Sequence, residues 1–412
     1  MTLKKIKNQQ LAIVGLASLL LLTACSTTNT SSQEKAITQS NSKSSQTSAK
    51  TSTNKVSSED KKTSYDEASS TKIILEDSSA KIDGEGVKLS NNQLVITQAG
   101  TYVLSGSSSN LQVLVNAPDN EDVHIVLDGV TMTGDQAVIN AQAAKKVYLT
   151  LADGSKNSLS DSTNNTDEKA DAVIFSVTDL TINGGGQLNV DGKVNNGIKA
   201  NDTLTVVGGE FDITATGDAF NVNDELTVID SKMIIEAGED AVKVDNDEDL
   251  SLGNMYLANN TFTISAGDDA IHASGDLLID SGTYVISKSV EGLEGKTVTV
   301  NGGNFDITAS DDGINAANAN VDSSEIFATF NGGDFKITMA DGDTDAVDSN
   351  GNLTVAGANF DITGQSAFDF DGELSHTGGK IIVNGEEQTE ITQTGPGSPG
   401  SGGPGGRAPG GF

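Results

Sequence analysis

The chain has 412 residues, with 25 Lys and Arg against 58 Asp and Glu, so its formal net charge is −33. Such an excess of carboxylates repels phosphate groups, which argues against nucleic acid as a partner and makes anionic membrane surfaces poor partners. Cys25 is the only cysteine, so an intrachain disulfide is excluded as well.

Residues 1–25 have the pattern of an export signal and are not expected to join the fold. Three lysines precede the apolar run LAIVGLASLLLL, which is too short to span a bilayer as a mature helix. The run ends in LTAC, and residues 22–25 resemble the lipobox of bacterial lipoproteins. The resemblance implies that Cys25 is acylated and anchors the chain to the outer face of the bacterial cell membrane. The alternative is an ordinary signal peptide with an incidental cysteine.

Two further segments are too polar to form a core. Residues 26–70 are almost entirely Ser, Thr, Asn, Gln and Lys, and such a composition cannot offset the entropy lost on folding. We expect a disordered tether that carries the folded part away from the membrane. Residues 391–412 are a Gly/Pro-rich tail, expected to be disordered, and they contain Arg407, the only arginine.

Between residues 71 and 195 the chain consists of short apolar runs broken by turns. KIILED, LQVLVNA and KVYLTL are examples, and Gly, Asn and Asp separate them. No segment here has helical periodicity. We interpret this region as the opening coils and N-terminal cap of a repeat array, because an uncovered end would expose strand edges.

From about residue 194 to residue 384 one unit recurs eight times. Its core is FDITATGDAFNV in one copy and FTISAGDDAIHA in another, and successive copies are 22, 22, 29, 22, 21, 33 and 21 residues apart. Each copy contains three short strands in which apolar and polar residues alternate, separated by Gly, Asn and Asp turns. A period in the twenties without helical patterning is typical of a solenoid.

The predicted fold is therefore all-β, a right-handed parallel β-helix over residues 71–390. Its coils would have three strands and about 22 residues each, with an N-terminal cap. We expect a monomer, since a capped β-helix needs no partner to cover its ends. Two columns of apolar residues should stack inside: Leu188, Phe211, Met233, Phe262, Tyr284, Phe305, Phe335, Phe360 and Ile381, and two residues later Val190, Ile213, Ile235, Ile264, Ile286, Ile307, Ile337, Ile362 and Val383.

Acidic residues recur at the turn that precedes the small residue of each coil. We call these positions the acidic column: Asn196, Asp218, Asp240, Asp269, Glu291, Asp312, Asp345 and Ser366. Carboxylates about 4.8 Å apart on adjacent coils repel by roughly 3 kcal/mol per pair, so a cation between them is expected. Calcium suits such a set of oxygen ligands. The predicted ligands are Asp218, Glu239, Asp240, Asp268, Asp269, Asp311, Asp312, Asp341, Asp343, Asp345 and Asp348. The alternative is that Asp merely favours turns and solvated faces.

Two residues after each small residue comes an outward-facing polar position. We call these positions the polar column, and we predict that the following members bind ligand: Lys199, Asn221, Lys243, His272, Glu294 and Asn315. Hydrogen-bonding groups beside bare Gly or Ala, flanked by cations, could hold an extended polymer that runs along the stack. The chain has no Trp for sugar stacking, so an acidic polysaccharide bridged by calcium fits better than a neutral glycan. The alternative is a face that is polar only for solubility.

A softer metal than calcium is not expected. The only cysteine lies in the export signal, and His124, His272 and His376 are scattered along the chain.

Three segments together resemble a family of secreted bacterial carbohydrate-binding domains. They are ITQAGTYVLSGSSSNLQVLVNAPDNEDVHIVLDGVTMTG, KVYLTLADGSKNSLSD and the GGEFDITATGDAFNV coils, and the resemblance covers roughly residues 71–385. It implies a right-handed parallel β-helix, bound calcium, binding of cellulose or of acidic sugars such as polygalacturonate, and similarity to family 9 polysaccharide lyases.

Three functions remain open at this point. We expect a surface lipoprotein that binds carbohydrate without turnover. The lyase relationship gives the main alternative, in which Lys243 or Lys199 would abstract the proton α to a uronate carboxylate beside calcium. Neighbouring acids raise the pKa of a lysine, which opposes that role. A structural surface adhesin is the third possibility.

Overall fold

The computed structural model describes residues 56–246, 248–342 and 344–394. The predicted export signal, Cys25 and most of the predicted tail lie outside these residues. Within them the chain forms 36 strands and one short 3-10 turn, η1 (Ser323–Glu325). No helix in the described ranges is long and apolar enough to cross a membrane.

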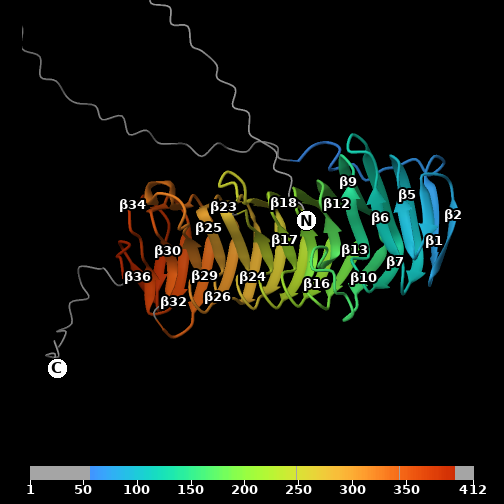
Figure 1. Ribbon diagram of the computed structural model, residues 1–412. Helices are drawn as coiled ribbons and strands as arrows, with labels where there is room; N and C mark the ends of the chain where they lie inside the picture. Colours follow the sequence, from blue (N-terminus) through green and yellow to red (C-terminus); the bar gives the residue numbers. More distant parts are fainter. Residues whose placement is uncertain (1–55, 247, 343, 395–412) are drawn as a thin grey trace, which may run out of the picture. The chain divides into compact units, whose positions relative to one another are not determined.

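The strands stack as successive coils along one axis (Figure 1). Over much of the stack each strand pairs in parallel with the strand three places along the chain, so the strands form three parallel faces, which we call sheets 1 to 3. Sheet 1 contains β10 (Lys156–Asp161), β13 (Gln187–Gly192), β16 (Glu210–Ala215), β19 (Lys232–Ala237), β22 (Asn260–Ser265), β24 (Gly282–Lys288), β26 (Asn304–Ala309), β29 (Asp334–Met339), β32 (Asn359–Thr363) and β35 (Ile381–Val383). Sheet 2 contains β4 (Gln93–Ile96), β6 (Gln112–Asn116), β8 (Ile139–Ala143), β11 (Ala172–Ser176), β14 (Asn196–Ala200), β17 (Phe220–Val222), β20 (Val242–Val244), β27 (Ile314–Ala316), β30 (Asp345–Ser349) and β33 (Ser366–Phe368).

Sheet 3 and the longer strands complete the coils. Sheet 3 contains β9 (Lys146–Leu151), β12 (Leu180–Gly184), β15 (Leu204–Val207), β18 (Glu225–Ile229), β21 (Asn254–Ala258), β28 (Phe327–Phe330), β31 (Asn352–Val355) and β34 (Leu374–His376). Four long strands turn a corner and serve two sheets: β5 (Gly100–Ser108), β7 (Asp122–Gly134), β23 (Ile271–Ile279) and β25 (Leu293–Val300). The prediction of an all-β parallel β-helix with three-strand coils is therefore confirmed.

Both apolar columns predicted from the sequence lie inside the coils. Their members pair in register from β13 to β35, for example Phe305 with Phe335 and Phe335 with Phe360. The rings of these three residues stack with centroids 4.5 and 4.7 Å apart. All the predicted members are buried except Val383, which is partly exposed in the last parallel strand. The alternation of apolar and polar residues thus sets which face of each strand is internal.

Antiparallel strands close both ends of the stack. At the N-terminal end β1 (Thr71–Glu76) pairs with β2 (Ser79–Asp83), and β3 (Val87–Ser90) pairs with β4. At the other end β36 (Glu386–Gln388) folds back on β35. These hairpins cover the backbone groups that a parallel stack would otherwise leave unpaired, as expected for caps.

The folded part extends beyond both predicted boundaries. At the C-terminal end Ile391 is buried and the Thr394 N–H donates to Phe368 O at 2.9 Å. At the N-terminal end residues 56–62, expected to be part of the tether, lie against sheet 3. Composition could not locate these boundaries, because a few well-placed polar contacts attach an otherwise hydrophilic segment.

Asp60 is the residue that holds the N-terminal segment on sheet 3. It is 4% exposed, and its Oδ1 accepts hydrogen bonds from Thr181 Oγ1 at 2.6 Å and pairs with Lys146 Nζ at 2.7 Å. Asn183 Nδ2 donates to the Asp60 and Lys62 carbonyls at 2.8 and 3.1 Å. Burial alone would raise the pKa of Asp60, but these partners and Ser57 outweigh it and lower the pKa to about 2.

We expect Asp60→Asn to loosen this segment. A carboxyl group whose pKa is lowered to about 2 stabilises the attachment above its unfolded pKa of 3.8 and loses that effect as pH falls through 2. At pH 7 the contribution is about 2 kcal/mol, so amide hydrogen exchange of residues 57–62 should become roughly thirtyfold faster. Asp66→Asn, which alters an exposed carboxylate with only local bonds, is the control. If amide hydrogen exchange of residues 57–62 is unchanged in Asp60→Asn, contacts other than those of the Asp60 carboxylate hold the segment on sheet 3.

Candidate binding and metal site

The acidic column runs along the turns that lead into sheet 2, and its carboxylates bond to the backbone of the next coil. Asp218 Oδ1 accepts the Asp240 N–H at 2.9 Å, and Asp240 Oδ1 accepts the Asp269 N–H at 2.8 Å. Asp269 Oδ1 accepts the Glu291 N–H at 3.0 Å. Asn196 begins the series in the same way, with its Oδ1 accepting the Asp218 N–H at 3.0 Å. One oxygen of each of these four side chains therefore serves the fold, which offsets part of the repulsion expected between stacked carboxylates.

The other carboxylate oxygen faces the polar column, whose members lie in register on sheet 2. Lys199 pairs with Asn221, and Lys243 pairs with His272. Glu294 continues the series, pairing with His272 on one side and with Asn315 on the other. Each polar-column residue lies three positions after a residue of the acidic column. The two predicted columns thus form one continuous polar strip along sheet 2.

The first half of this strip supplies its own cations. Lys199 Nζ lies 2.8 Å from Asp171 Oδ1, and Lys243 Nζ lies 2.7 Å from Asp240 Oδ2. Burial opposes the charge on Lys243, but Asp240 and Asp218 outweigh it and raise the pKa of the ammonium group. Asp171 was missed from the sequence, although it precedes β11 as the acidic residues precede the later coils of sheet 2.

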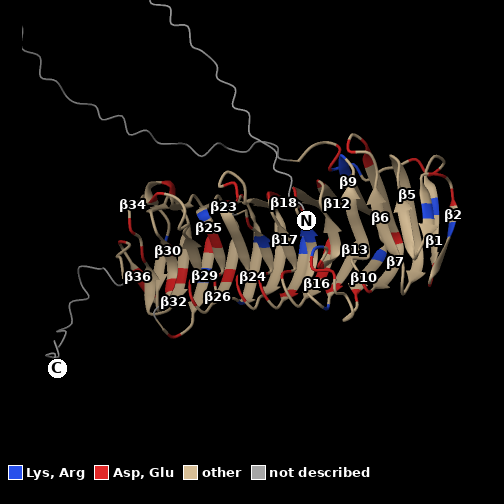
Figure 2. Ribbon diagram, viewed as in Figure 1, with Lys and Arg blue, Asp and Glu red and all other residues tan. Residues whose placement is uncertain are grey.

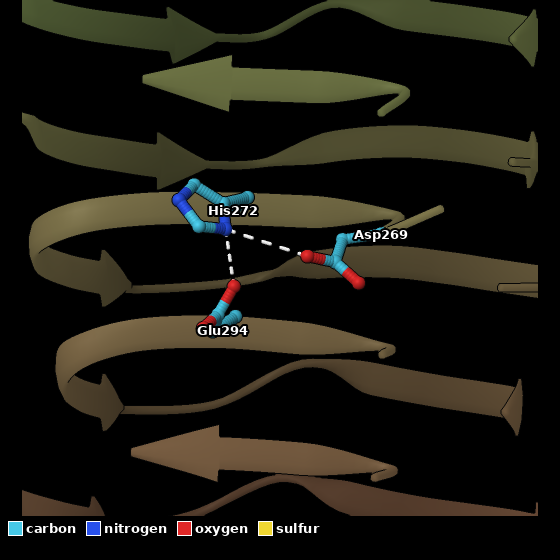
Figure 3. Close-up of side chains that lie close together, drawn as sticks. All are labelled: Asp269, His272 and Glu294. Atoms are coloured by element: carbon cyan, nitrogen blue, oxygen red, sulfur yellow. Dashed lines mark hydrogen bonds and ion pairs between the residues drawn. The ribbon is translucent and has the colours of Figure 1, made fainter. Parts of the chain in front are cut away.

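His272 lies between two carboxylates from adjacent coils. Figure 3 shows Asp269 and Glu294 both directed at His272 Nδ1, which lies 3.4 Å from Asp269 Oδ2 and in contact with Glu294 Oε2. Burial favours the neutral ring, but the two carboxylates outweigh it and raise the pKa of His272 to about 10. The same bonds, with that from the Glu291 N–H, overcome burial and lower the pKa of Asp269.

Two groups of side chains bring three possible metal ligands within 4.8 Å of one another among the described residues. One is Asp269, His272 and Glu294, and the other is Asp240, Asp268 and Asp269. Asp269 belongs to both groups. Of the predicted calcium ligands, these groups bring together Asp240, Asp268 and Asp269, whereas His272 and Glu294 were predicted to bind the polymer rather than a metal.

The second half of the strip, from Glu291 to Asp348, is rich in carboxylates and poor in cations. Burial, then repulsion from neighbouring acids, raises the pKa of Glu291 to about 8 and that of Asp348 to about 7. Burial and nearby acids also raise the pKa of Asp312 to about 6, against a hydrogen bond from the Asp345 N–H. Asn315, 8% exposed, donates through Nδ2 to both Glu291 oxygens at 3.1 Å, and its buried Oδ1 has no hydrogen-bond partner within the described ranges.

The remaining predicted ligands are less closely grouped. Glu239, Asp311 and Asp341 are exposed, and Asp345 and Asp348 lie on β30. Asp343 lies outside the described residues. Acidic residues are spread over the turns of the stack and lysines are few (Figure 2).

A shallow groove of about 350 Å³ lies on the outer face of sheet 1, away from the predicted site residues. It crosses β24, β26, β29, β32 and β35, and Lys336 forms an ion pair with Asp306 there at 3.0 Å. The outward-facing residues of sheet 1 that line the groove differ in type from coil to coil, so the repeat pattern could not predict the groove.

Similarity to known proteins identifies the family of the chain. The sequence profile described as "Carbohydrate-binding domain-containing protein" matches residues 90–346 and 268–395. A protein of the same description from Acetivibrio thermocellus is 34% identical over 153 residues, which is 35% of this chain and 54% of that protein, so the match spans about half of the relative. A solved polysaccharide lyase-like protein from C. thermocellum, in a gadolinium derivative, matches with a TM-score of 0.37 and 23% identity over 75% of this chain and 99% of that one. The profile match covers well over half of the sequence, and the chain therefore belongs to the family of carbohydrate-binding domain-containing proteins.

Proposed function

We propose that the chain binds an acidic polysaccharide along the strip on sheet 2, with calcium, and without turnover. The observation that carries this proposal is the register of the polar column beside the acidic column over six coils, from Lys199 to Asn315. Hydrogen-bonding groups repeat at the spacing of adjacent strands, about 4.8 Å, which suits a polymer that lies along the stack. Lys199 and Lys243 supply positive charge for carboxylates of the ligand.

The second half of the strip is the proposed calcium site. Its donor set fits a hard cation, since carboxylate and amide oxygens are the ligands calcium prefers. Asn315, whose buried Oδ1 has no hydrogen-bond partner among the described residues, pairs in register with Asp348 and donates to Glu291. Burial and repulsion between neighbouring acids raise the pKa values of Glu291, Asp312 and Asp348. Bound calcium would neutralise this repulsion and bridge to carboxylates of the polysaccharide.

Binding without turnover is preferred because of Lys243. A general base must lose its proton near neutral pH, whereas the Asp240 carboxylate raises the pKa of Lys243 above the ordinary value. The predicted export signal and the lipobox-like residues 22–25 support a place on the outer face of a bacterial membrane.

Affinity electrophoresis of the full chain in polygalacturonate gels tests the proposal. We expect retention with millimolar calcium that disappears in EDTA, with no unsaturated product absorbing in the ultraviolet. Lys243→Gln should weaken binding by roughly 10- to 100-fold, because a hydrogen bond to a charged group contributes about 1.5–3 kcal/mol.

Lys336→Gln is the matched control, since it removes a lysine from the sheet 1 groove instead. If Lys336→Gln weakens retention and Lys243→Gln does not, the groove is the binding site. Retention that persists in EDTA would refute the role of calcium, and release of unsaturated product would show a lyase.

A further inference from the structure

The group formed by Asp269, His272 and Glu294 differs chemically from the oxygen-only donors of the rest of the strip. Three donor atoms, one imidazole nitrogen and two carboxylate oxygens, lie within 4.8 Å of one another. Calcium takes oxygen ligands, whereas an imidazole with carboxylates suits first-row transition metals and zinc. A metal of this kind was not expected from the sequence, because the three histidines are scattered along the chain. The fold supplies the missing neighbours for one of them.

The backbone fixes these three side chains in place. His272 and Glu294 are directly paired residues of β23 and β25, and Asp269 lies in the turn that leads into β23. Asp269 cannot swing away freely, because its Oδ1 accepts the Glu291 N–H and its own N–H donates to Asp240. Only Oδ2 is left to face His272, as Figure 3 shows. Such preorganisation reduces the entropy lost when a ligand binds.

Charge and access also fit a divalent cation. With a neutral imidazole the group carries two negative charges, and Asp240 and Asp268 lie beside it in the second group of ligands. The three side chains are about 12–20% exposed, so a bound ion could keep water at its remaining positions. Three protein ligands with an open position are typical of zinc sites that stay accessible.

We propose that Asp269, His272 and Glu294 form a site for zinc or a similar transition metal, separate from the calcium site around Asn315 and Asp348. The imidazolium form of His272 is the competing state, in which a proton takes the place of the metal between the same two carboxylates. This proposal shares His272 and Glu294 with the proposed polysaccharide-binding strip, but its test uses the metal alone, so the two proposals can fail separately.

The test is a calorimetric titration of the full chain with zinc. Millimolar calcium is present throughout, to fill the oxygen-only sites. We expect one zinc site per chain that is weakened at least tenfold in His272→Gln, while calcium-dependent thermal stabilisation persists. His376→Gln, which removes a histidine of β34 on sheet 3, should leave zinc binding unchanged.

A second measurement needs no variant. In the unsubstituted chain the NMR signals of the His272 ring should shift with zinc and not with calcium. Two results would overturn the proposal: His272 ring signals that do not shift with zinc, or equal zinc affinity in His272→Gln and the unsubstituted chain. His272 would then be an imidazolium that joins two carboxylates. Loss of polysaccharide retention with intact zinc binding would instead refute the proposed function alone.

Discussion

Phe335→Ala is expected to destabilise the β-helix by about 3–5 kcal/mol, the range for removing a large buried aromatic side chain. Phe335 is 2% exposed and stacks between Phe305 and Phe360, with a third ring, Phe330, edge-on at 5.4 Å. Truncation would leave a cavity in the middle of the aromatic column and remove contacts with both neighbouring coils. Each coil of a solenoid is stabilised mainly by its neighbours, so the damage should be concentrated around β26, β29 and β32.

Chemical denaturation with hydrogen exchange by mass spectrometry measures this effect and its location. Val285→Ala is the control, because Val285 is 39% exposed on the outer face of β24 and its truncation should cost under about 1 kcal/mol. The stacked internal column would be contradicted if Phe335→Ala lowers the free energy of unfolding by less than about 1 kcal/mol. It would also be contradicted if amide hydrogen exchange rises uniformly over all coils.

Asp348→Asn is expected to have opposite effects with and without calcium. Burial and the neighbouring Asp312 and Asp345 raise the pKa of Asp348 to about 7, so its ionised form opposes folding near neutral pH. At about 1.4 kcal/mol per pKa unit, and with solvent screening, the substitution should stabilise the chain in EDTA by roughly 2–3 kcal/mol. In millimolar calcium the same substitution removes a proposed ligand, so most of the calcium-dependent rise in Tm should be lost.

Thermal melts of the full chain in both conditions measure the two effects together. Asp361→Asn, which alters an exposed acid on sheet 1, should change neither the stability in EDTA nor the calcium-dependent rise in Tm. If Asp348→Asn is destabilising in EDTA, repulsion does not dominate at this position. If the calcium-dependent rise in Tm is unchanged in Asp348→Asn, Asp348 is not a ligand and the calcium site lies elsewhere in the acidic column.

The sequence alone determined the architecture of this protein. Period-2 alternation decides which side of each strand is apolar, and the recurrence of FDIT-like strands at about 22 residues requires neighbouring coils to pair in register. Those two facts placed Phe335 and its column inside and Lys243 outside. The same register also placed the acidic column beside the polar column, because identical positions of a repeat must stack.

The tertiary structure decided how the polar side chains are used. Sequence spacing cannot show that Asp218 Oδ1 bonds to the Asp240 backbone while its Oδ2 accepts from Asn221, because both oxygens belong to one turn residue. The repeat register predicts that His272 and Glu294 stack, but it could not show that His272 Nδ1 meets both the Glu294 and the Asp269 carboxylate. Nor could it attach Asp60 to a sheet some 120 residues further along the chain. Repeating backbone geometry follows from local pattern, whereas side-chain partners, pKa values and non-repeating contacts depend on which groups meet after the chain has folded.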